Sequence, residues 1–444
     1  MNTLAAPVTD VVEQLKQAWT RSDSIFELLG EGAWNVRPIA LRQPLVFYLG
    51  HLPAFAWNQL GRGLLDQPAC RADFDELFEF GIDPLDATGV PTEPDWPDHG
   101  EILAYRDEIR RRLLDAVPAV DALADANELA RERRIYHVVL EHELMHHETL
   151  LYMIAELDEG LKRAPQQTRV TPAGPVDTRE TCEIPTGLTH IGAQFDDIPF
   201  GWDNEFPRRT VGVPAFRIDR YPVTNESYRL FVEAAGYHAR SHWTRAGWTW
   251  REEQELAHPH HWRRHGSGWC VRGPFGELPF DTVARWPAQV SQAEASAYAS
   301  WSGARLPTEA ELNRAAYDTP SGSRRAYPWG DDAPTAEHGN FGFTHWEPTP
   351  VGSHPEGMSA WGVHELVGNG WEHSGTPFRP LPGFEPWIST YAGYSADFFD
   401  DKHFVVFGGS WATSVPLLRR SFRNWFQPHY PYVFSKFRCV HPDR

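Results

Sequence analysis

The sequence predicts an α + (α+β) protein: a helical bundle over residues 1–160, a linker over 161–183 and a mixed, loop-rich domain over 184–444. Three observations support this division. Apolar residues recur at helical spacing in four long segments of the first part. A polar stretch with three prolines follows. Beyond it, short β-type runs alternate with Gly/Pro turns. A chain of 444 residues is also too long for one ordinary core.

The first domain is expected to contain four long helices. Their amphipathic segments cover residues 11–29, 45–65, 102–117 and 129–157. Pro53 is expected to interrupt the second segment, because proline lacks the amide donor of a helix interior. A Pro- and Asp-rich loop over residues 81–100 joins the second and third segments. Four such helices bury their apolar faces most simply as a bundle.

The second domain has a different pattern. Short β-type runs occur at residues 189–192, 215–219 and 404–407, and only residues 225–235 and 292–302 look helical. The whole chain contains 19 Trp and 37 Pro, which suits irregular segments held by aromatic packing. We therefore expect a loop-dominated α+β domain.

Composition restricts the possible partners. The formal net charge of −19 disfavours binding to nucleic acid or to an anionic membrane. No run of about 18 apolar residues and no signal-peptide pattern is visible, so a cytoplasmic protein is expected. The four cysteines lie far apart without a CxxC pair, which argues against a thiolate metal site and against a disulfide framework.

The fourth helical segment carries the motif H-E-x-x-H, with His142 and His146 four residues apart. Residues at this spacing lie on one helical face, about 5–6 Å apart at Cβ, so both imidazoles can reach one ion. A third nitrogen is needed, and the candidates are His51, His99, His137 and His147. Three imidazoles suit Fe(II), Zn(II) and Cu(II) alike, and they leave positions open for catalysis. The pair could also be ordinary hydrogen-bonded helix histidines.

Two further histidine patterns need an interpretation. H-E-x-x-H also matches zinc peptidases, in which Glu143 would be the general base, but no further ligand stands out shortly downstream. A second cluster surrounds Arg263 and Arg264, and its irregular spacing favours a solvated loop. Its members are His258, His260, His261 and His265.

The C-terminal half resembles the formylglycine-generating-enzyme (sulfatase-modifying factor) domain, which has a C-type-lectin-like fold. The matching motifs are TyrProValThrAsn, ArgLeuProThrGluAlaGluLeu, TyrProTrpGly, GluLeuValGlyAsnGlyTrpGlu, GlyGlySerTrp and PheArgCysVal, at residues 221–225, 305–312, 327–330, 365–372, 408–411 and 437–440. The helical half looks like a DinB-type four-helix bundle. Together they are similar to the hercynine-dependent sulfoxide synthases of ergothioneine biosynthesis and to their relative, selenoneine synthase.

This resemblance implies a non-haem Fe(II) enzyme that uses O₂. In the family a GlyHisLeu element and H-E-x-x-H supply the iron ligands, which selects His51 together with His142 and His146. A formylglycine-generating enzyme is less similar, because Cys270 and Cys439 do not reproduce its copper-binding cysteine pair. A lectin-like binding module without catalysis would not explain the histidine set.

The resemblance also assigns roles around hercynine. An Asn-Trp pair, here Asn424 and Trp425, would bind it, with the indole facing the quaternary ammonium. A Tyr-x-x-Tyr-Ser element makes Tyr391 the expected proton donor and Tyr394 its neighbour. Met145 stands where the family has a Gln that hydrogen-bonds hercynine.

The second substrate is expected to differ from that of the γ-glutamylcysteine enzymes. Phe426 and Tyr430 replace the Asp and Arg of those enzymes, and the loop over residues 81–90 contains no Arg. An anionic dipeptide therefore lacks its charge-assisted anchors. An uncharged selenosugar such as 1-seleno-glucose fits better, and the product would then be selenoneine. Cysteine and γ-glutamylcysteine are the alternative donors.

Overall fold

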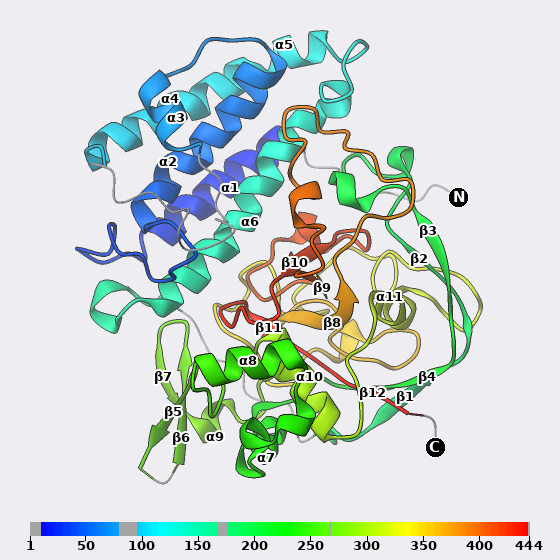
Figure 1. Ribbon diagram of the computed structural model, residues 1–444. Coiled ribbons are helices and arrows are strands. Elements are labelled where there is room, and N and C mark those ends of the chain that lie inside the picture. Colours follow the sequence, from blue (N-terminus) through cyan, green and yellow to red (C-terminus); the bar gives the residue numbers. More distant parts are fainter. Residues whose placement is uncertain (1–9, 80–95, 167–173, 175, 267, 443–444) are drawn as a thin grey trace. The chain divides into compact units, whose positions relative to one another are not determined.

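The structure is a computed structural model that describes residues 10–79, 96–166, 174, 176–266 and 268–442 (Figure 1). The chain divides into two compact units. The first comprises Met1–Pro165 together with Ile388–Ala392, and the second comprises Gln166–Trp387 and Gly393–Arg444. The short segment Ile388–Ala392 therefore packs as part of the helical unit, although it lies more than two hundred residues downstream.

The first unit is helical, as expected. Its helices are α1 (Val11–Phe26), α2 (Leu45–Ala56), α3 (Ala72–Leu77), α4 (His99–Asp115), α5 (Val117–Ala122) and α6 (Arg134–Glu156). The Asp10 carboxylate caps α1 by accepting from the amide of Val12, and Asp98 caps α4 in the same way. The four long predicted segments correspond to α1, α2, α4 and α6, which confirms the helical part of the fold class.

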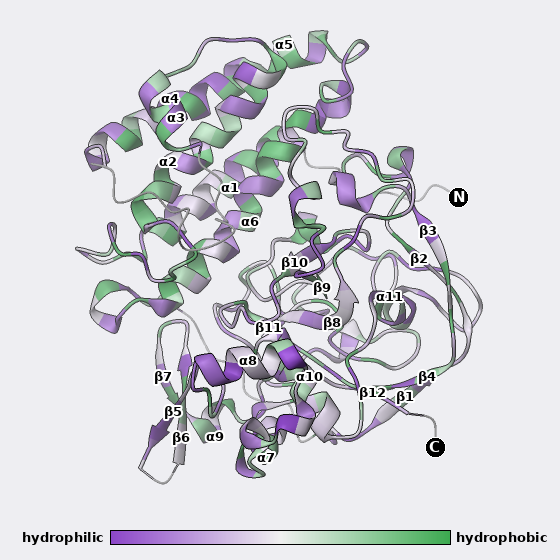
Figure 2. Cartoon of the chain, in the orientation of Figure 1, coloured by the Kyte–Doolittle hydropathy of each residue, from purple (hydrophilic) through white to green (hydrophobic). Residues whose placement is uncertain are grey.

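The expected break at Pro53 is wrong. α2 runs through Pro53, and all twelve of its residues are buried, so packing on every side compensates for one missing hydrogen bond. The irregularity comes later, where Trp57–Leu64 form a π-helical stretch. Gly61 is required there, because a Cβ atom at this position would lie 2.4 Å from the Trp57 ring. Figure 2 shows the long hydrophobic stretches of α2 and α6.

The described residues of the second unit form four small sheets. Their strand orders are β1 (Thr181–Ile184)-β4 (Phe216–Asp219)-β12 (Val440–His441), β10 (Asn424–Phe426)-β9 (Phe404–Phe407)-β8 (Trp371–Pro377)-β11 (Ser435–Lys436), β2 (Gly187–Ile191)-β3 (Arg209–Val213) and β5 (Trp262–His265)-β6 (Gly268–Gly273)-β7 (Gly276–Pro279). The pairing is antiparallel except for β8 with β11. The three predicted β-type runs correspond to β2, β4 and β9.

More helices surround these sheets than the sequence pattern indicated. They are α7 (Asn225–Glu233), α8 (Arg245–Glu253), α9 (Phe280–Val283), α10 (Gln292–Trp301) and α11 (Glu309–Tyr317). The expectation of only two was wrong, because α8, α9 and α11 are helical as well. Most side chains of α11 are buried, the charged ones included, so burial there does not follow residue polarity. The solvated-loop interpretation of the second histidine cluster also fails in part, since His265 ends strand β5 and His261 is buried.

Buried charges hold the sheet that contains β8 and β11. Arg438 and Glu372 form an ion pair of 3.1 Å with neither side chain exposed. The Lys436 ammonium donates to the carbonyl oxygens of Gly368 and Gly370, and burial lowers the pKa of Lys436 to about 8.

Within the described residues, no helix has both the length and the apolar character needed to span a membrane.

Candidate metal centre

Three histidine side chains converge inside the helical unit. His51 comes from α2, and His142 and His146 come from successive turns of α6. Each offers one nitrogen, and the three nitrogens lie within 4.8 Å of one another. The ring centroids are 5.1 Å apart for His51–His142, 5.2 Å for His51–His146 and 4.5 Å for His142–His146. All three side chains are at least 96% buried.

The chemistry of these nitrogens fits a metal ion. His51 donates its Nδ1 proton to the carbonyl of Phe78 at 2.7 Å, which leaves the Nε2 lone pair available. Among the described residues, no hydrogen-bond partner exists for His51 Nε2, His142 Nε2 or His146 Nδ1, although all three atoms are buried. A buried polar atom left unpaired costs about 1–3 kcal/mol, and coordination to a metal would remove that cost.

Burial also keeps these imidazoles in the form that binds metals. It lowers the pKa of His51 to about 4, against the smaller opposing effect of the Phe78 carbonyl. It holds the pKa values of His142 and His146 well below the usual value of histidine, and neighbouring imidazoles add to the effect. Neutral imidazole is the metal-binding form, so the cluster is suited to a divalent ion.

Aromatic rings surround the histidine cluster. The ring of Phe55, on α2, stacks on His142 with a centroid distance of 3.5 Å and an interplanar angle of 7°. The ring of Tyr391 meets Phe55 edge-on at 5.2 Å, so this tyrosine reaches the neighbourhood of the histidines within the helical unit. Met145 lies half-buried on α6, one residue before His146. Sequence reasoning missed Phe55, although its position four residues after His51 places both on one helical face.

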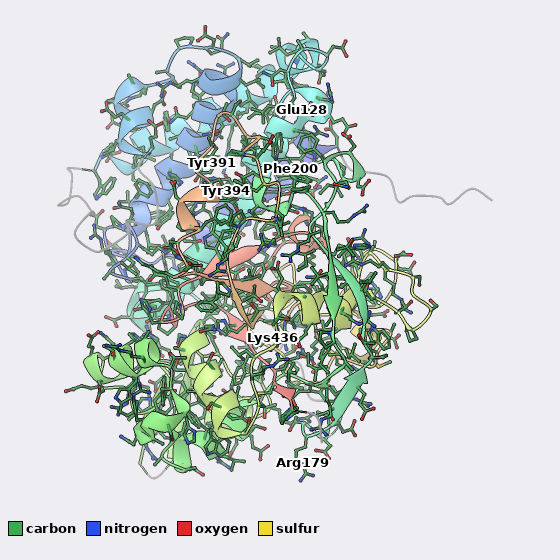
Figure 3. The ribbon with its side chains drawn as sticks, turned by 45° about the vertical axis from the view of Figure 1, so that its right-hand side comes forward. Glu128, Arg179, Phe200, Tyr391, Tyr394 and Lys436 are labelled. Carbon is green, nitrogen blue, oxygen red and sulfur yellow. The ribbon has the colours of Figure 1, made fainter. Side chains whose placement is uncertain are left out.

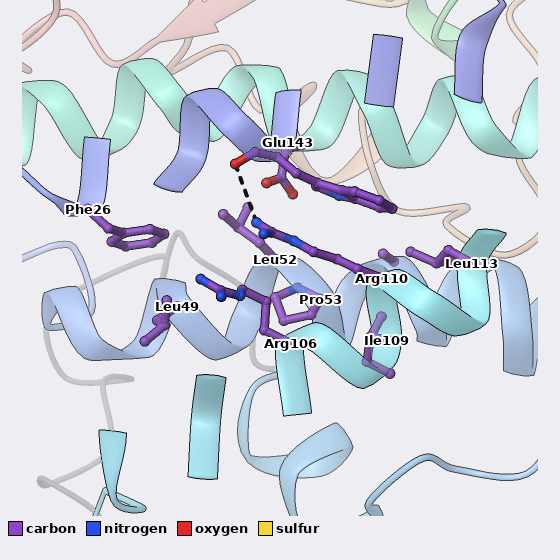
Figure 4. A pocket seen from close by; sticks show the side chains of 11 residues that line it. Phe26, Leu49, Leu52, Pro53, Arg106, Ile109, Arg110, Leu113 and Glu143 are labelled. Carbon is purple, nitrogen blue, oxygen red and sulfur yellow. Dashed lines mark hydrogen bonds between the residues drawn. The ribbon is translucent and has the colours of Figure 1, made fainter. Parts of the chain in front are cut away.

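Glu143, the middle residue of H-E-x-x-H, is directed toward a different helix. Its carboxylate accepts a hydrogen bond from Ser22 of α1, and the same hydroxyl lies 2.8 Å from Nε2 of His147. Glu143 lines a small pocket that is also lined by Trp19, Arg106 and Arg110 (Figure 4). None of the three converging histidines lines this pocket. Burial raises the pKa of Glu143.

The remaining candidate residues fall in the second unit. Tyr394 stacks on Trp202 at 3.9 Å and meets Trp425 edge-on at 5.4 Å. Trp425 stacks on Phe378 at 4.1 Å, and its amide donates to the Asn424 side chain at 2.8 Å. The structure therefore brings Tyr394, Asn424 and Trp425 together. Figure 3 labels Tyr391 and Tyr394, which lie three residues apart on one segment.

Phe426 and Tyr430 lie together a few residues after Trp425. Their rings are nearly parallel, with an angle of 6° and a centroid separation of 5.8 Å. Phe426 is partly exposed and Tyr430 is buried. The loop over residues 81–90, which was expected to lack an anchoring arginine, lies outside the described residues.

Comparison with known proteins extends over both parts of the chain. Residues 166–442 match the Sulfatase-modifying factor enzyme 1-like domain, and residues 14–150 match the DinB superfamily. These matches confirm the predicted fold class.

Three similar proteins are named hercynine oxygenase. The one from Mycolicibacterium thermoresistibile is 40% identical, over 75% of this chain and 72% of its own length. The one from Mycobacterium tuberculosis is 39% identical over 76% of both chains. The one from Mycolicibacterium smegmatis is 35% identical, over 90% of this chain and 91% of its own length, so its similarity extends through both domains.

Proposed function

The chain belongs to the hercynine oxygenase family, and from this premise we propose that it is an Fe(II)- and O₂-dependent oxidoreductase acting on hercynine. The proposed reaction joins a chalcogen donor R–XH, where X is sulfur or selenium, to C2 of the hercynine imidazole. The C2–H and X–H bonds break and a C2–X bond forms. One atom of O₂ becomes the oxide on X, and the other leaves as water with the two hydrogens. O₂ takes up four electrons: two are released when C2–H and X–H are replaced by the C2–X bond, and two when X is oxidised to its oxide.

The observation that supports this proposal is the cluster of three buried histidines with unpaired nitrogens. We assign His51, His142 and His146 as ligands of Fe(II), because three ligands from two helices leave other positions open. The iron supplies the redox chemistry with O₂. Tyr391 is assigned as the proton donor to the oxygen being reduced, since its ring lies one aromatic neighbour away from His142.

Residues of the second unit are assigned to recognition of hercynine. Trp425 presents an aromatic face to the quaternary ammonium, a contact worth about 0.5–2 kcal/mol, and the Asn424 amide bonds to the substrate. Tyr394 meets the Trp425 ring edge-on and so holds it in place. Met145 would border hercynine beside the ligand His146 without offering a strong hydrogen bond.

We further propose that the donor is a selenosugar, 1-seleno-glucose, and that the product leads to selenoneine through a selenoxide. The partly exposed ring of Phe426, with the buried ring of Tyr430 parallel to it, offers an uncharged aromatic surface in place of a carboxylate and a guanidinium. A hydroxyl-rich sugar can pack on such a surface, whereas an anionic dipeptide would need a charge to pair with. Cysteine or γ-glutamylcysteine as donor, giving an ergothioneine-type sulfoxide, is the alternative.

One assay tests both levels of the proposal. Protein loaded anaerobically with Fe(II) receives hercynine with 1-seleno-glucose, 1-thio-glucose, cysteine or γ-glutamylcysteine, then air, and mass spectrometry identifies the products. Zn(II)-loaded protein and His142→Ala serve as controls and should give no adduct. Failure to form an adduct with every donor would refute the hercynine reaction. An adduct with γ-glutamylcysteine alone would overturn only the selenosugar assignment.

A further inference from the structure

The ring of Phe55 lies between a histidine of the cluster and Tyr391. Its face covers the His142 ring, with centroids 3.5 Å apart and planes within 7° of parallel. Tyr391 contacts it edge-on, at 5.2 Å and 72°. Phe55 is 7% exposed. One apolar side chain thus contacts both a proposed iron ligand and the proposed proton donor.

His142 depends on this contact for its orientation more than His51 does. Histidine ligands of metals usually donate their second ring N–H to a neighbouring acceptor, which fixes the plane of the ring. His51 does this through the carbonyl of Phe78. In the part of the chain that the structure describes, no hydrogen bond to the His142 ring is found. Because rotation about the last side-chain bond of histidine is only weakly restricted, packing must set the direction of its nitrogen lone pair.

The residues that contact the segment around Tyr391 come from α2 and from the π-helical stretch that follows it. After Phe55 the chain enters the π-helical Trp57–Leu64, and Gly63 of this stretch faces Thr390. A Cβ atom at Gly63 would lie 2.7 Å from Cγ2 of Thr390, so a larger residue there would have to displace this side chain. The amide of Tyr391 also bonds to the carbonyl of Ile388 at 2.9 Å, which closes a turn.

We propose that Phe55 is a positioning residue with two functions: its face sets the ring plane of His142 for metal binding, and its edge holds Tyr391 beside the cluster. Gly63 contributes to the second function alone. This inference rests on the proposed function in its assignment of the ligands and of the tyrosine. The inference adds Phe55 as a residue that contacts both the ligand His142 and the tyrosine Tyr391.

Metal affinity and hydrogen exchange test the two functions separately. Co(II) binding to metal-free protein is followed by competition titration and by the visible spectrum of the bound ion. Exchange of the 388–392 backbone is followed by mass spectrometry. Phe55→Leu should weaken Co(II) binding by about 10–100-fold, the usual effect of losing support behind a ligand, should shift the Co(II) bands, and should speed exchange at 388–392.

Matched variants separate these effects from general loss of packing. Phe47 also stacks on a histidine of the cluster, at 5.0 Å from His51, but His51 keeps its bond to Phe78. Phe47→Leu should therefore change Co(II) affinity by less than roughly threefold. Gly63→Ala should speed exchange at 388–392 without changing Co(II) affinity. Gly160→Ala should change neither, because a Cβ atom there meets nothing within 4 Å.

Several results would overturn the inference. Equal Co(II) affinities for Phe55→Leu and Phe47→Leu would remove the first function, and unchanged exchange in Phe55→Leu would remove the second. Phe55→Met, whose flexible unbranched side chain adapts to the space left by the ring, carries the same predictions and the same test if Phe55→Leu does not fold. Neither measurement requires turnover, so a failure of the hercynine reaction in the unaltered protein would refute the proposed function without deciding the role of Phe55.

Discussion

Glu143→Gln distinguishes the proposed oxidoreductase from a zinc peptidase built on the same motif. In a peptidase this carboxylate would be the general base, and its loss would lower the rate by about 10²–10⁴-fold. Here the carboxylate accepts from Ser22 of α1 and lines a pocket that excludes the three clustered histidines. The amide oxygen of Gln accepts the same hydrogen bond. We therefore expect iron content to be unchanged, and kcat/KM for hercynine to stay within roughly twofold of the unaltered protein.

The structural role of Glu143 gives this prediction a stability control. Ser22→Ala removes the hydroxyl that serves both Glu143 and His147, and a lost bond to a buried polar group costs about 1–3 kcal/mol. Urea unfolding of the metal-free protein should show this loss for Ser22→Ala, and a change of less than about 1 kcal/mol for Glu143→Gln. If Glu143→Gln lost more than about 100-fold in activity while retaining stoichiometric iron, Glu143 would take part in the chemistry and our reasoning would be refuted.

Three further outcomes are expected. His51→Ala should abolish stoichiometric iron binding while far-UV circular dichroism stays unchanged, and retained iron would contradict the ligand assignment. Tyr391→Phe should slow or redirect the reaction without weakening hercynine binding, measured by calorimetry; unchanged turnover would place the proton donor elsewhere. Burial and the charges of Arg220 and Arg438 lower the pKa of His364 to about 4, so the unfolded state takes up its proton first as the pH falls below about 6.5. His364→Phe removes this titration and keeps a ring against Tyr221. As the pH falls from about 6.5 to 4, its free energy of unfolding should rise relative to that of the unaltered protein by about 1–3 kcal/mol. An unchanged difference between the two proteins over this pH range would contradict the prediction.

The helices of the first unit were predictable where one face is buried and the opposite face is exposed to solvent. Such helices show a period of 3.6 residues, as α1 does, and its expected end at residue 29 lay only three residues beyond Phe26. α2 was harder to delimit, because all of its residues are buried and Pro53 resembles a stop signal. The fold class did not depend on that boundary and is confirmed.

Other features depend mainly on tertiary contacts, although the capping box of Thr308 and Glu311 does mark the start of α11 in the sequence. α11 is buried nearly all round, and its charged side chains are neutralised by distant partners, as in the 2.7 Å ion pair of Glu309 with Arg423. Likewise, nothing in the residues around Tyr391 indicates that Ile388–Ala392 packs with the helical unit. Phe55 could have been found, because it follows His51 by one turn. The assignments of ligands, tyrosine and substrate residues stay predictions.

The segment H-E-x-x-H-H of α6 contains two residue pairs at a spacing of four, and these pairs lie on adjacent faces of one helix. His142 and His146 meet a third imidazole on α2, whereas Glu143 and His147 meet a hydroxyl on α1. The motif alone therefore does not say what Glu143 does. Its carboxylate could act at the metal site, as in a zinc peptidase, or it could bind a different helix, as it does here through Ser22. The neighbouring helices decide: among the residues that the structure describes, only α2 offers a further imidazole nitrogen within coordinating reach of the pair. Glu143 and His147 bind Ser22 on the face of α6 next to the one that carries His142 and His146, so both faces of this helix have polar partners on neighbouring helices.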